Sequence, residues 1–127
     1  MRIRPMISKE LREGANSQSL QALDIGKLSI GSKEFFFDRV FDQDTPQADL
    51  FDTCAHNLIL SCFSGYNATI LAYGQTGSGK THTMGTGSTV GLSSEQIGIV
   101  PRVFDFIFEE LENRRRMSEF NQFEVKV

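Results

Sequence analysis

Apolar residues recur at helical spacing in two stretches of the chain. In the first stretch these residues are Leu50, Phe51, Cys54, Leu58, Ile59 and Cys62. Their spacing places them on one stripe and predicts an amphipathic helix. Thr45 is expected to cap this helix with Pro46 at its first position, and Gly65 is expected to end it.

The second helical pattern resumes near Pro101 after an interruption. Its inward-facing residues are expected to be Val103, Phe104, Ile107, Phe108 and Leu111. Residues 114–116 are three arginines, whose charges suit the negative end of a helix dipole. A polar loop rich in Ser, Thr and Gly, residues 85–98, precedes this helix. The pattern therefore predicts a helix that is broken by a loop and then continues.

Shorter patterns predict β-strands on either side of the first helix. Residues 20–25 and 28–30 flank a tight turn at Gly26-Lys27, and residues 33–41 follow with four phenylalanines that are expected to be core. After the helix, residues 68–73 are a short apolar run that predicts a buried parallel strand. Strands and helices in this order indicate an α/β fold.

The residues directly after this last strand form a phosphate-binding pattern. They are Gly74-Gln75-Thr76-Gly77-Ser78-Gly79-Lys80-Thr81, which fits G-x-x-x-x-G-K-[ST] without a mismatch. Glycines let backbone N–H groups approach phosphate oxygens. The Lys80 ammonium can bind the β and γ phosphates, and the Thr81 hydroxyl can coordinate Mg²⁺. Because a strand precedes the loop and a helix follows it, the sequence predicts a site for a nucleoside triphosphate.

The wider stretch around this loop, residues 65–84, resembles the P-loop signature of kinesin motor domains. Three other segments resemble family motifs in the family's order. They are Arg2-Ile3-Arg4-Pro5 (R-x-R-P), residues 37–42 (F-x-x-V-F) and residues 97–102 (G-[IV]-[IV]-P-R). The resemblance spans essentially all 127 residues. The insert after Gly85-Thr86-Gly87 is most similar to the chromokinesin-related group with N-terminal motors.

The resemblance implies the three-layer α/β sandwich of the kinesin motor domain, a P-loop NTPase fold. A kinesin motor domain is well over twice as long as this chain, and Met1 nearly abuts the R-x-R-P motif. At the other end, residues 123–127 alternate in polarity and are typical of a strand that begins. We therefore expect residues 1–127 to be the N-terminal portion of a motor domain whose C-terminal part is absent.

The resemblance also implies where the adenine base binds. It places Arg2, Arg4 and Pro5 around the base together with His82, which follows the P-loop threonine. A guanidinium or imidazole group can stack on a purine. The expected ligands are thus ATP and Mg²⁺, with Thr81 as the metal ligand, and a plain surface role for His82 is the alternative.

No catalytic residue is predicted. Hydrolysis requires a second acidic group near Mg²⁺ and a group that orients the attacking water. In kinesins these come from segments that resemble N-x-x-S-S-R-S-H and D-L-A-G-x-E, and neither occurs in this sequence. Asp105 lies between two phenylalanines and is expected on the polar face of its helix. The implied function is the ATP-binding part of a microtubule motor that hydrolyses ATP in the full-length protein, while the isolated chain is expected to be inactive.

Composition narrows the expected partners. A net charge of −3 and a pI near 5.3 argue against nucleic acid and give no support for contact with acidic tubulin within this segment. The resemblance places the microtubule contact in later parts of the motor. No apolar run approaches the roughly 18 residues of a membrane span and no signal peptide is visible, so a cytoplasmic protein is expected. The resemblance implies that it acts on microtubules. Cys54 and Cys62 are expected to be buried reduced thiols and His56 a solvated helix residue.

Two alternatives stay open from the residues alone. One is a P-loop NTPase of another class, although a GTPase is expected to carry N-K-x-D, which is missing. The other is a truncated, non-catalytic product of a motor gene.

Overall fold

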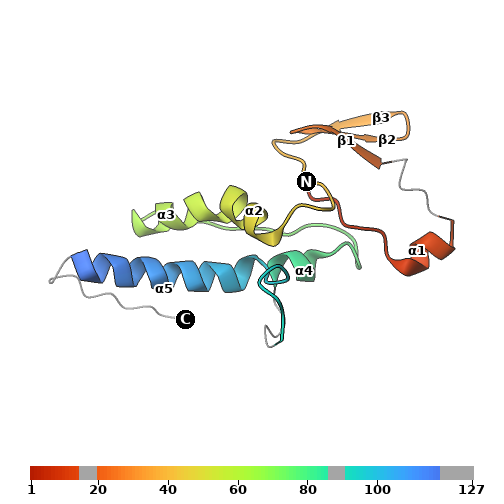
Figure 1. Cartoon of the computed structure of the whole chain (residues 1–127). Helices are drawn as coiled ribbons and strands as arrows, with labels where there is room; N and C mark the ends of the chain where they lie inside the picture. The colour runs from red at the N-terminus through yellow and green to blue at the C-terminus, as the bar shows by residue number, and fades with distance from the viewer. Residues whose placement is uncertain (15–19, 86–90, 118–127) are drawn as a thin grey trace. The chain divides into compact units, whose positions relative to one another are not determined.

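The computed structural model describes residues 1–14, 20–85 and 91–117 (Figure 1). The backbone forms two compact units, Met1–Pro46 and a second unit that begins at Gln47. The predicted strand at residues 123–127 and part of the predicted loop, residues 86–90, lie outside the described residues. None of the described helices combines the length and the apolar character needed to cross a bilayer.

The first unit contains an antiparallel sheet of three strands in the order β1-β2-β3 (Figure 1). The strands are β1 (Leu20–Asp24), β2 (Lys27–Ile30) and β3 (Lys33–Phe36). All three predicted strands are confirmed, but β3 is shorter than residues 33–41. The first turn is Ile25-Gly26 and not Gly26-Lys27, because Lys27 already pairs with Asp24.

Three of the four phenylalanines that were expected in the core are exposed. Phe35, Phe36 and Phe37 are 41%, 73% and 39% exposed, whereas Phe41 is 6% exposed. Side chains on a sheet are buried only when a further layer covers that face, and the described residues of this unit supply none for β3. Phe41 is buried because its backbone pairs in parallel with the N-terminus, where the Ile3 N–H donates to the Phe41 carbonyl at 2.8 Å.

The first predicted helix is confirmed but contains a π-helical turn. It consists of α2 (Gln47–Phe51), the π segment η2 (Asp52–His56) and α3 (Asn57–Phe63). The helix begins at Gln47, so the prediction that Pro46 takes its first position is wrong by one residue. It ends at Phe63, which is followed by Ser64 and by Gly65 with a φ of 91°, so the predicted stop at Gly65 is confirmed. The π turn adds a residue to one turn and so rotates the apolar stripe. The buried apolar residues of this helix are Leu50, Phe51, Ala55 and Ile59.

This rotation corrects the expected burial of both cysteines. Cys54 is half-buried and Cys62 is exposed, so the prediction of two buried thiols is wrong for Cys62. Both are free thiols. Leu58 is also on the outer edge of the stripe, with 38% of its surface exposed.

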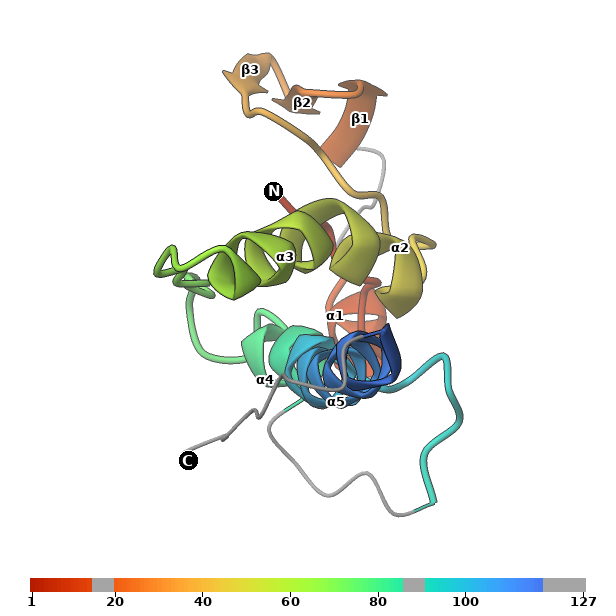
Figure 2. The same ribbon diagram turned by 90° about the vertical axis from the view of Figure 1, so that its left-hand side faces the viewer.

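Helix α5 (Ile99–Met117) packs along the α2 and η2 end of the first helix, and the two helices lie side by side in both views (Figure 1, Figure 2). It begins at Ile99, so Pro101 lies within its first turn, where a missing N–H costs no helical hydrogen bond. Phe106 contacts the rings of Phe51 and His56 at centroid distances of 6.1 and 4.7 Å. The prediction that His56 is solvated is therefore wrong, because it is half-buried between two aromatic rings.

The inward face of α5 is only partly as expected. Val103, Ile107 and Leu111 are half-buried, whereas Phe104 and Phe108 are 44% and 55% exposed. The prediction is therefore wrong for Phe104 and Phe108, and it did not include the half-buried Phe106. At the end of α5, Arg114 bonds Glu110 at 2.7 Å and stacks on Phe63, so it has contacts beyond the helix dipole. Asp105 is exposed on the polar face, as predicted.

The predicted buried strand at residues 68–73 is not formed. No other described segment pairs with it, and Leu71 and Tyr73 are 83% and 95% exposed. A parallel strand exists only through hydrogen bonds to a neighbouring strand, and the one sheet of the described residues contains β1, β2 and β3 alone. The segment thus has the apolar sequence of a buried strand, but no neighbouring strand within the described residues.

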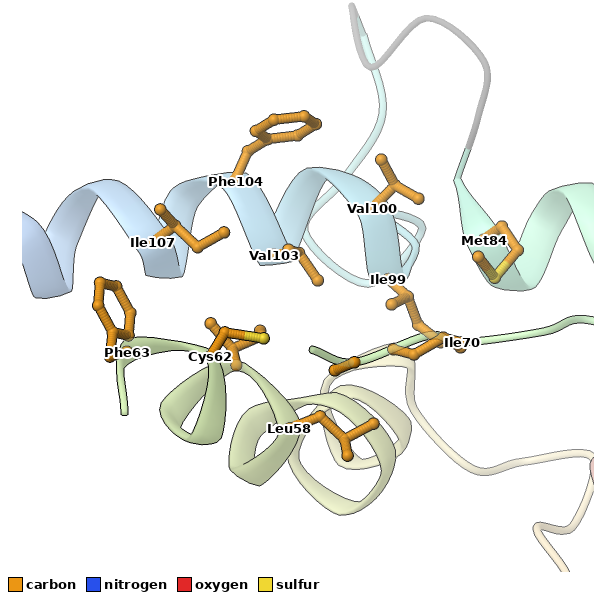
Figure 3. Close-up of a pocket in the computed structure, with 12 residues that line it drawn as sticks. Leu58, Cys62, Phe63, Ile70, Met84, Ile99, Val100, Val103, Phe104 and Ile107 are labelled. Atoms are coloured by element: carbon orange, nitrogen blue, oxygen red, sulfur yellow. The ribbon is translucent and has the colours of Figure 1, made fainter. Parts of the chain in front are cut away.

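An apolar cavity of about 480 Å³ lies between α3, the segment around Ile70 and α5 (Figure 3). Most of its lining residues are labelled in Figure 3: Leu58, Cys62, Phe63, Ile70, Met84, Ile99, Val100, Val103, Phe104 and Ile107. The cavity is the unfilled interior beside the unpaired segment.

The break between the two helical segments is confirmed and is closed by two glycines. Helix α4 (Lys80–Met84) ends at Gly85, which has a φ of 72°. A Cβ at Gly85 would lie 2.8 Å from the Cα of Gly98, and one at Gly98 would lie 2.6 Å from the Cα of Gly85. The two ends of the loop therefore touch through their backbones, which only glycine permits.

We expect Gly85→Ala to destabilise the chain more than Gly65→Ala. Both glycines follow a helix with positive φ, so both variants bear the left-handed strain of about 1–2 kcal/mol. Only the Gly85 methyl meets backbone atoms, which adds about 1–3 kcal/mol of overpacking. Urea unfolding followed by circular dichroism measures the difference. Equal losses in the two variants would contradict the close contact between the loop ends.

Candidate phosphate-binding site

The loop of residues 74–79 has backbone geometry that requires its glycines. Gly77 and Gly79 have φ values of 78° and 95°, in the left-handed region that other residues avoid. At Gly74 the restriction is space, because a Cβ there would lie 2.6 Å from the Ser78 Oγ. The loop curls tightly and then continues directly into α4 at Lys80.

Lys80 reaches back across the loop. Its Nζ donates to the carbonyls of Gly74 and Gln75, both at 2.7 Å. An ammonium group has three N–H donors, so these two bonds leave one for an incoming anion. The positive charge is thereby held at the mouth of the loop, where the β and γ phosphates of a nucleotide would bind.

Ser78 and Thr81 complete the polar lining of the site. The Ser78 Oγ is buried and has no hydrogen-bond partner within the described part of the chain. A buried hydroxyl without a partner is costly, and it can donate a hydrogen bond to a phosphate oxygen. The Thr81 residue is exposed, so its hydroxyl is open to a ligand. These residues fit a polyphosphate group.

A divalent cation here would have few protein ligands. Residues 1–14, 20–85 and 91–117 contain no cluster of three or more His, Cys, Asp or Glu side chains that could hold a metal. Within the predicted site, Thr81 is the residue that the phosphate-loop pattern places on Mg²⁺. The ion would therefore be held mainly by phosphate oxygens and water, as Mg²⁺ usually is in nucleotide sites.

His82 is held by a residue that the sequence did not point to. Gln47, the first residue of α2, is 2% exposed, and its Nε2 donates to the His82 carbonyl at 2.7 Å. The same Nε2 lies 3.2 Å from the His82 Nδ1. His82 itself is exposed. In the sequence, Gln47 is an ordinary polar residue at the start of a helix. No pattern in the sequence indicates that it is buried or that it bonds His82.

The three other predicted base-binding residues lie in the first unit. Arg2 is half-buried beside Phe41, and burial lowers its pKa. Pro5 is exposed. His82 lies in the second unit.

Arg4 has a partner that the sequence analysis missed. Its guanidinium forms a two-pronged ion pair with Glu10 of helix α1 (Ser8–Arg12), with Nη1 2.9 Å from Oε2 and Nη2 bonded to Oε1. The bond to Arg4, together with the Ile7 N–H, lowers the pKa of Glu10 to about 2, and the pair raises the pKa of Arg4. Glu10 occupies N–H groups at the edge of the Arg4 guanidinium, so the two flat faces of the guanidinium are left for stacking. Neither α1 nor Glu10 was predicted.

Comparison with known proteins gives one consistent family. A family model described as "Kinesin motor domain" matches residues 2–127. The mouse protein "Kinesin-like protein KIF21B" is 45% identical over 120 residues, and mouse "Chromosome-associated kinesin KIF4" is 42% identical over 122 residues. Each alignment covers 94% of this chain.

Two solved structures of a Drosophila protein are similar to the fold. The "Drosophila kinesin family member Kin10/NOD in complex with divalent manganese and ADP" matches with a TM-score of 0.73 and 32% identity over 82% of this chain. Drosophila NOD docked with bovine tubulin into a map of nucleotide-free NOD complexed to the microtubule also has a TM-score of 0.73, with 31% identity over 79% of this chain.

This chain is much shorter than the proteins it matches. It spans 7% of the first mouse relative and 10% of the second. It spans 36% and 35% of the two solved chains.

We expect the Arg4–Glu10 pair to make the first unit sensitive to acid. Because the pKa of Glu10 is lowered from 4.5 to about 2, its ionised form stabilises the fold above pH 4.5, and this contribution is lost as the pH falls toward 2. An NMR titration of the Glu10 carboxyl carbon should give a midpoint far below 4.5. In Arg4→Gln the midpoint should rise toward 4.5, since the bond to Arg4 is the largest cause of the shift. A midpoint near 4.5 in the unchanged chain would mean that the pair does not form.

Proposed function

This chain belongs to the kinesin motor-domain family, and we propose that its part in that family is to bind ATP together with Mg²⁺. The resemblance read from the sequence motifs is confirmed by the family match and by relatives that are 42% to 45% identical. The relatives include a chromosome-associated kinesin, in agreement with the predicted chromokinesin-related group. The architecture is the N-terminal portion of the kinesin α/β motor fold.

The geometry of the phosphate loop is the observation that carries this proposal. Its left-handed glycines, the Lys80 ammonium across its mouth and the unpartnered Ser78 hydroxyl all fit a polyphosphate. The NOD structure with ADP and manganese supports an adenine nucleotide with a divalent cation. We assign the β and γ phosphates to Lys80 and the cation to Thr81.

The adenine base is assigned to Arg2, Arg4, Pro5 and His82. Stacking is the contact we favour for Arg4, because Glu10 occupies the edge of its guanidinium. This assignment rests on the family motif.

Kinesin motors hydrolyse ATP and move along microtubules, and we propose the same activity for the full-length protein in the cytoplasm. The NOD structure docked onto a microtubule supports the partner. For the 127-residue chain itself we propose binding without hydrolysis, because neither switch segment occurs in the sequence. The microtubule contact is assigned to other parts of the motor. A truncated, non-catalytic product remains the second candidate, while the family match argues against a GTPase.

We further propose that residues 1–127 are part of one motor domain whose remaining strands cover the second unit. Three observations support this: the unpaired segment at residues 68–73, the apolar cavity of about 480 Å³, and an alignment that covers only 36% of the NOD chain. In a three-layer sandwich the apolar faces of α3 and α5 pack on a sheet. The segment at residues 68–73 would be one strand of that sheet.

We expect Lys80→Ala to weaken binding of a fluorescent ATP analogue by roughly tenfold to a hundredfold, the value of a lost hydrogen bond to a charged group. Lys33→Ala is the matched control, since it removes the same charge from an exposed site in β3. Titration by fluorescence anisotropy measures both affinities. Equal binding by wild type and Lys80→Ala would overturn the assigned phosphate site.

ATP hydrolysis is measured separately, on the wild-type chain and on Lys80→Ala. We expect no ATP turnover by the 127-residue chain, with or without microtubules. Turnover that rises with microtubules and vanishes in Lys80→Ala would show that the chain needs no further switch segment.

We expect the exposed apolar cavity to bind the dye anilinonaphthalene sulfonate, which reports open hydrophobic surface. Val103→Asp places a charge in the cavity lining and should lower the dye fluorescence. Leu11→Asp is the control, because Leu11 is exposed in the first unit. A longer protein that contains the whole motor should bind little dye, and strong binding by it would contradict the proposed cover.

A further inference from the structure

Gln47 is a buried polar side chain whose contacts lead to the nucleotide site. It is 2% exposed and, with Leu28, it is one of the two largest fully buried side chains in the described residues. Burying an amide is unfavourable unless hydrogen bonds replace its contacts with water. The bonds to His82 of α4 therefore explain why a glutamine, and not an apolar residue, starts α2.

These contacts determine which way the Gln47 amide faces. The atom 2.7 Å from the His82 carbonyl must be a donor, because a carbonyl oxygen can only accept. That atom is consequently the amide nitrogen. It has two hydrogens, so it can also donate to the His82 Nδ1 at 3.2 Å.

The same contacts determine the tautomer of His82. Because an amide nitrogen only donates, the facing Nδ1 must accept and has no proton. The proton of the neutral ring is then on Nε2, at the other side of the imidazole. Nε2 has no hydrogen-bond partner among the residues that the structure describes, and His82 is exposed, so this N–H is open to a ligand.

We propose that Gln47 is a positioning residue for nucleotide recognition, which holds His82 in one orientation and as the Nε2–H tautomer. His82 lies in α4, the helix that begins at the phosphate loop, and the proposed function assigns it to the base. An Nε2–H donor matches an acceptor nitrogen on a purine ring, and a ring held in place loses less entropy on binding. This inference rests on the proposed function, since it assigns a role toward the base of the same nucleotide.

The tautomer is tested first, on the unchanged chain. Long-range ¹H–¹⁵N NMR correlation distinguishes a protonated from an unprotonated imidazole nitrogen. We expect His82 to show a proton on Nε2 and none on Nδ1, and Gln47→Met to give an averaged pattern. A proton on Nδ1, or averaging in the unchanged chain, would overturn the proposal without any variant having to fold.

Binding is tested with ATP and with inorganic triphosphate, which lacks the base. We expect Gln47→Met to weaken ATP binding roughly fivefold, the value of one ordinary hydrogen bond, and to leave triphosphate binding unchanged. His82→Ala should lose at least as much. The double variant should lose no more than His82→Ala alone, because Gln47 acts through His82. Gln96→Met is the control, since Gln96 bonds Ser93 and not His82.

The outcomes separate this inference from the proposed function. If neither ATP nor triphosphate binds the unchanged chain, the phosphate site fails and the role of Gln47 falls with it. If both bind and Gln47→Met changes neither affinity, the phosphate site stands and only the role of Gln47 is overturned. Losses of ATP affinity that add in the double variant would show that Gln47 acts independently of His82, which also overturns it.

Discussion

A helix of five residues, α4, carries the phosphate loop, and a helix of this length is not stable by itself. Its position must therefore come from contacts with other elements. At its C-terminal end the backbone of Gly85 touches that of Gly98, which joins it to the start of α5. In its middle, His82 is bonded by Gln47 at the start of α2. The geometry of the site depends on these two anchors.

Both anchors lead to the same pair of long helices. Helix α5 and the α2–η2 segment pack through Phe106, Phe51 and His56, which gives a firm base on one side of α4. The loop itself adds the bonds from Lys80 to two of its carbonyls. A nucleotide that draws the third Lys80 donor and the Ser78 hydroxyl would tighten the loop further, since binding stabilises the state that it selects. The helix packing thus supports the loop before a ligand is present.

The other side of the second unit has no such support. Between α3 and α5 the apolar side chains line a cavity (Figure 3). Within the described residues, the segment at residues 68–73 has no strand beside it. This segment leads directly into the loop, so the loop is anchored through α4 and not through the strand that precedes it. In the three-layer arrangement of the family both sides would be covered. The described chain shows how much of the site the helices can form without the sheet.

Local requirements of the backbone can be predicted from the residues alone. Spacing and residue type act over a few neighbouring residues, and they predict the glycines, Lys80 and Thr81 of the phosphate loop, the three strands β1 to β3 and the existence of both long helices. The family could be predicted as well, because each of its motifs is a short continuous stretch of sequence. Which side chains are buried and paired depends on the tertiary structure. Gln47, Glu10 and His56 acquire their partners from other segments, and the exposed Phe36 and Leu71 lack a covering layer, because burial depends on what packs opposite a residue and not on the residue itself.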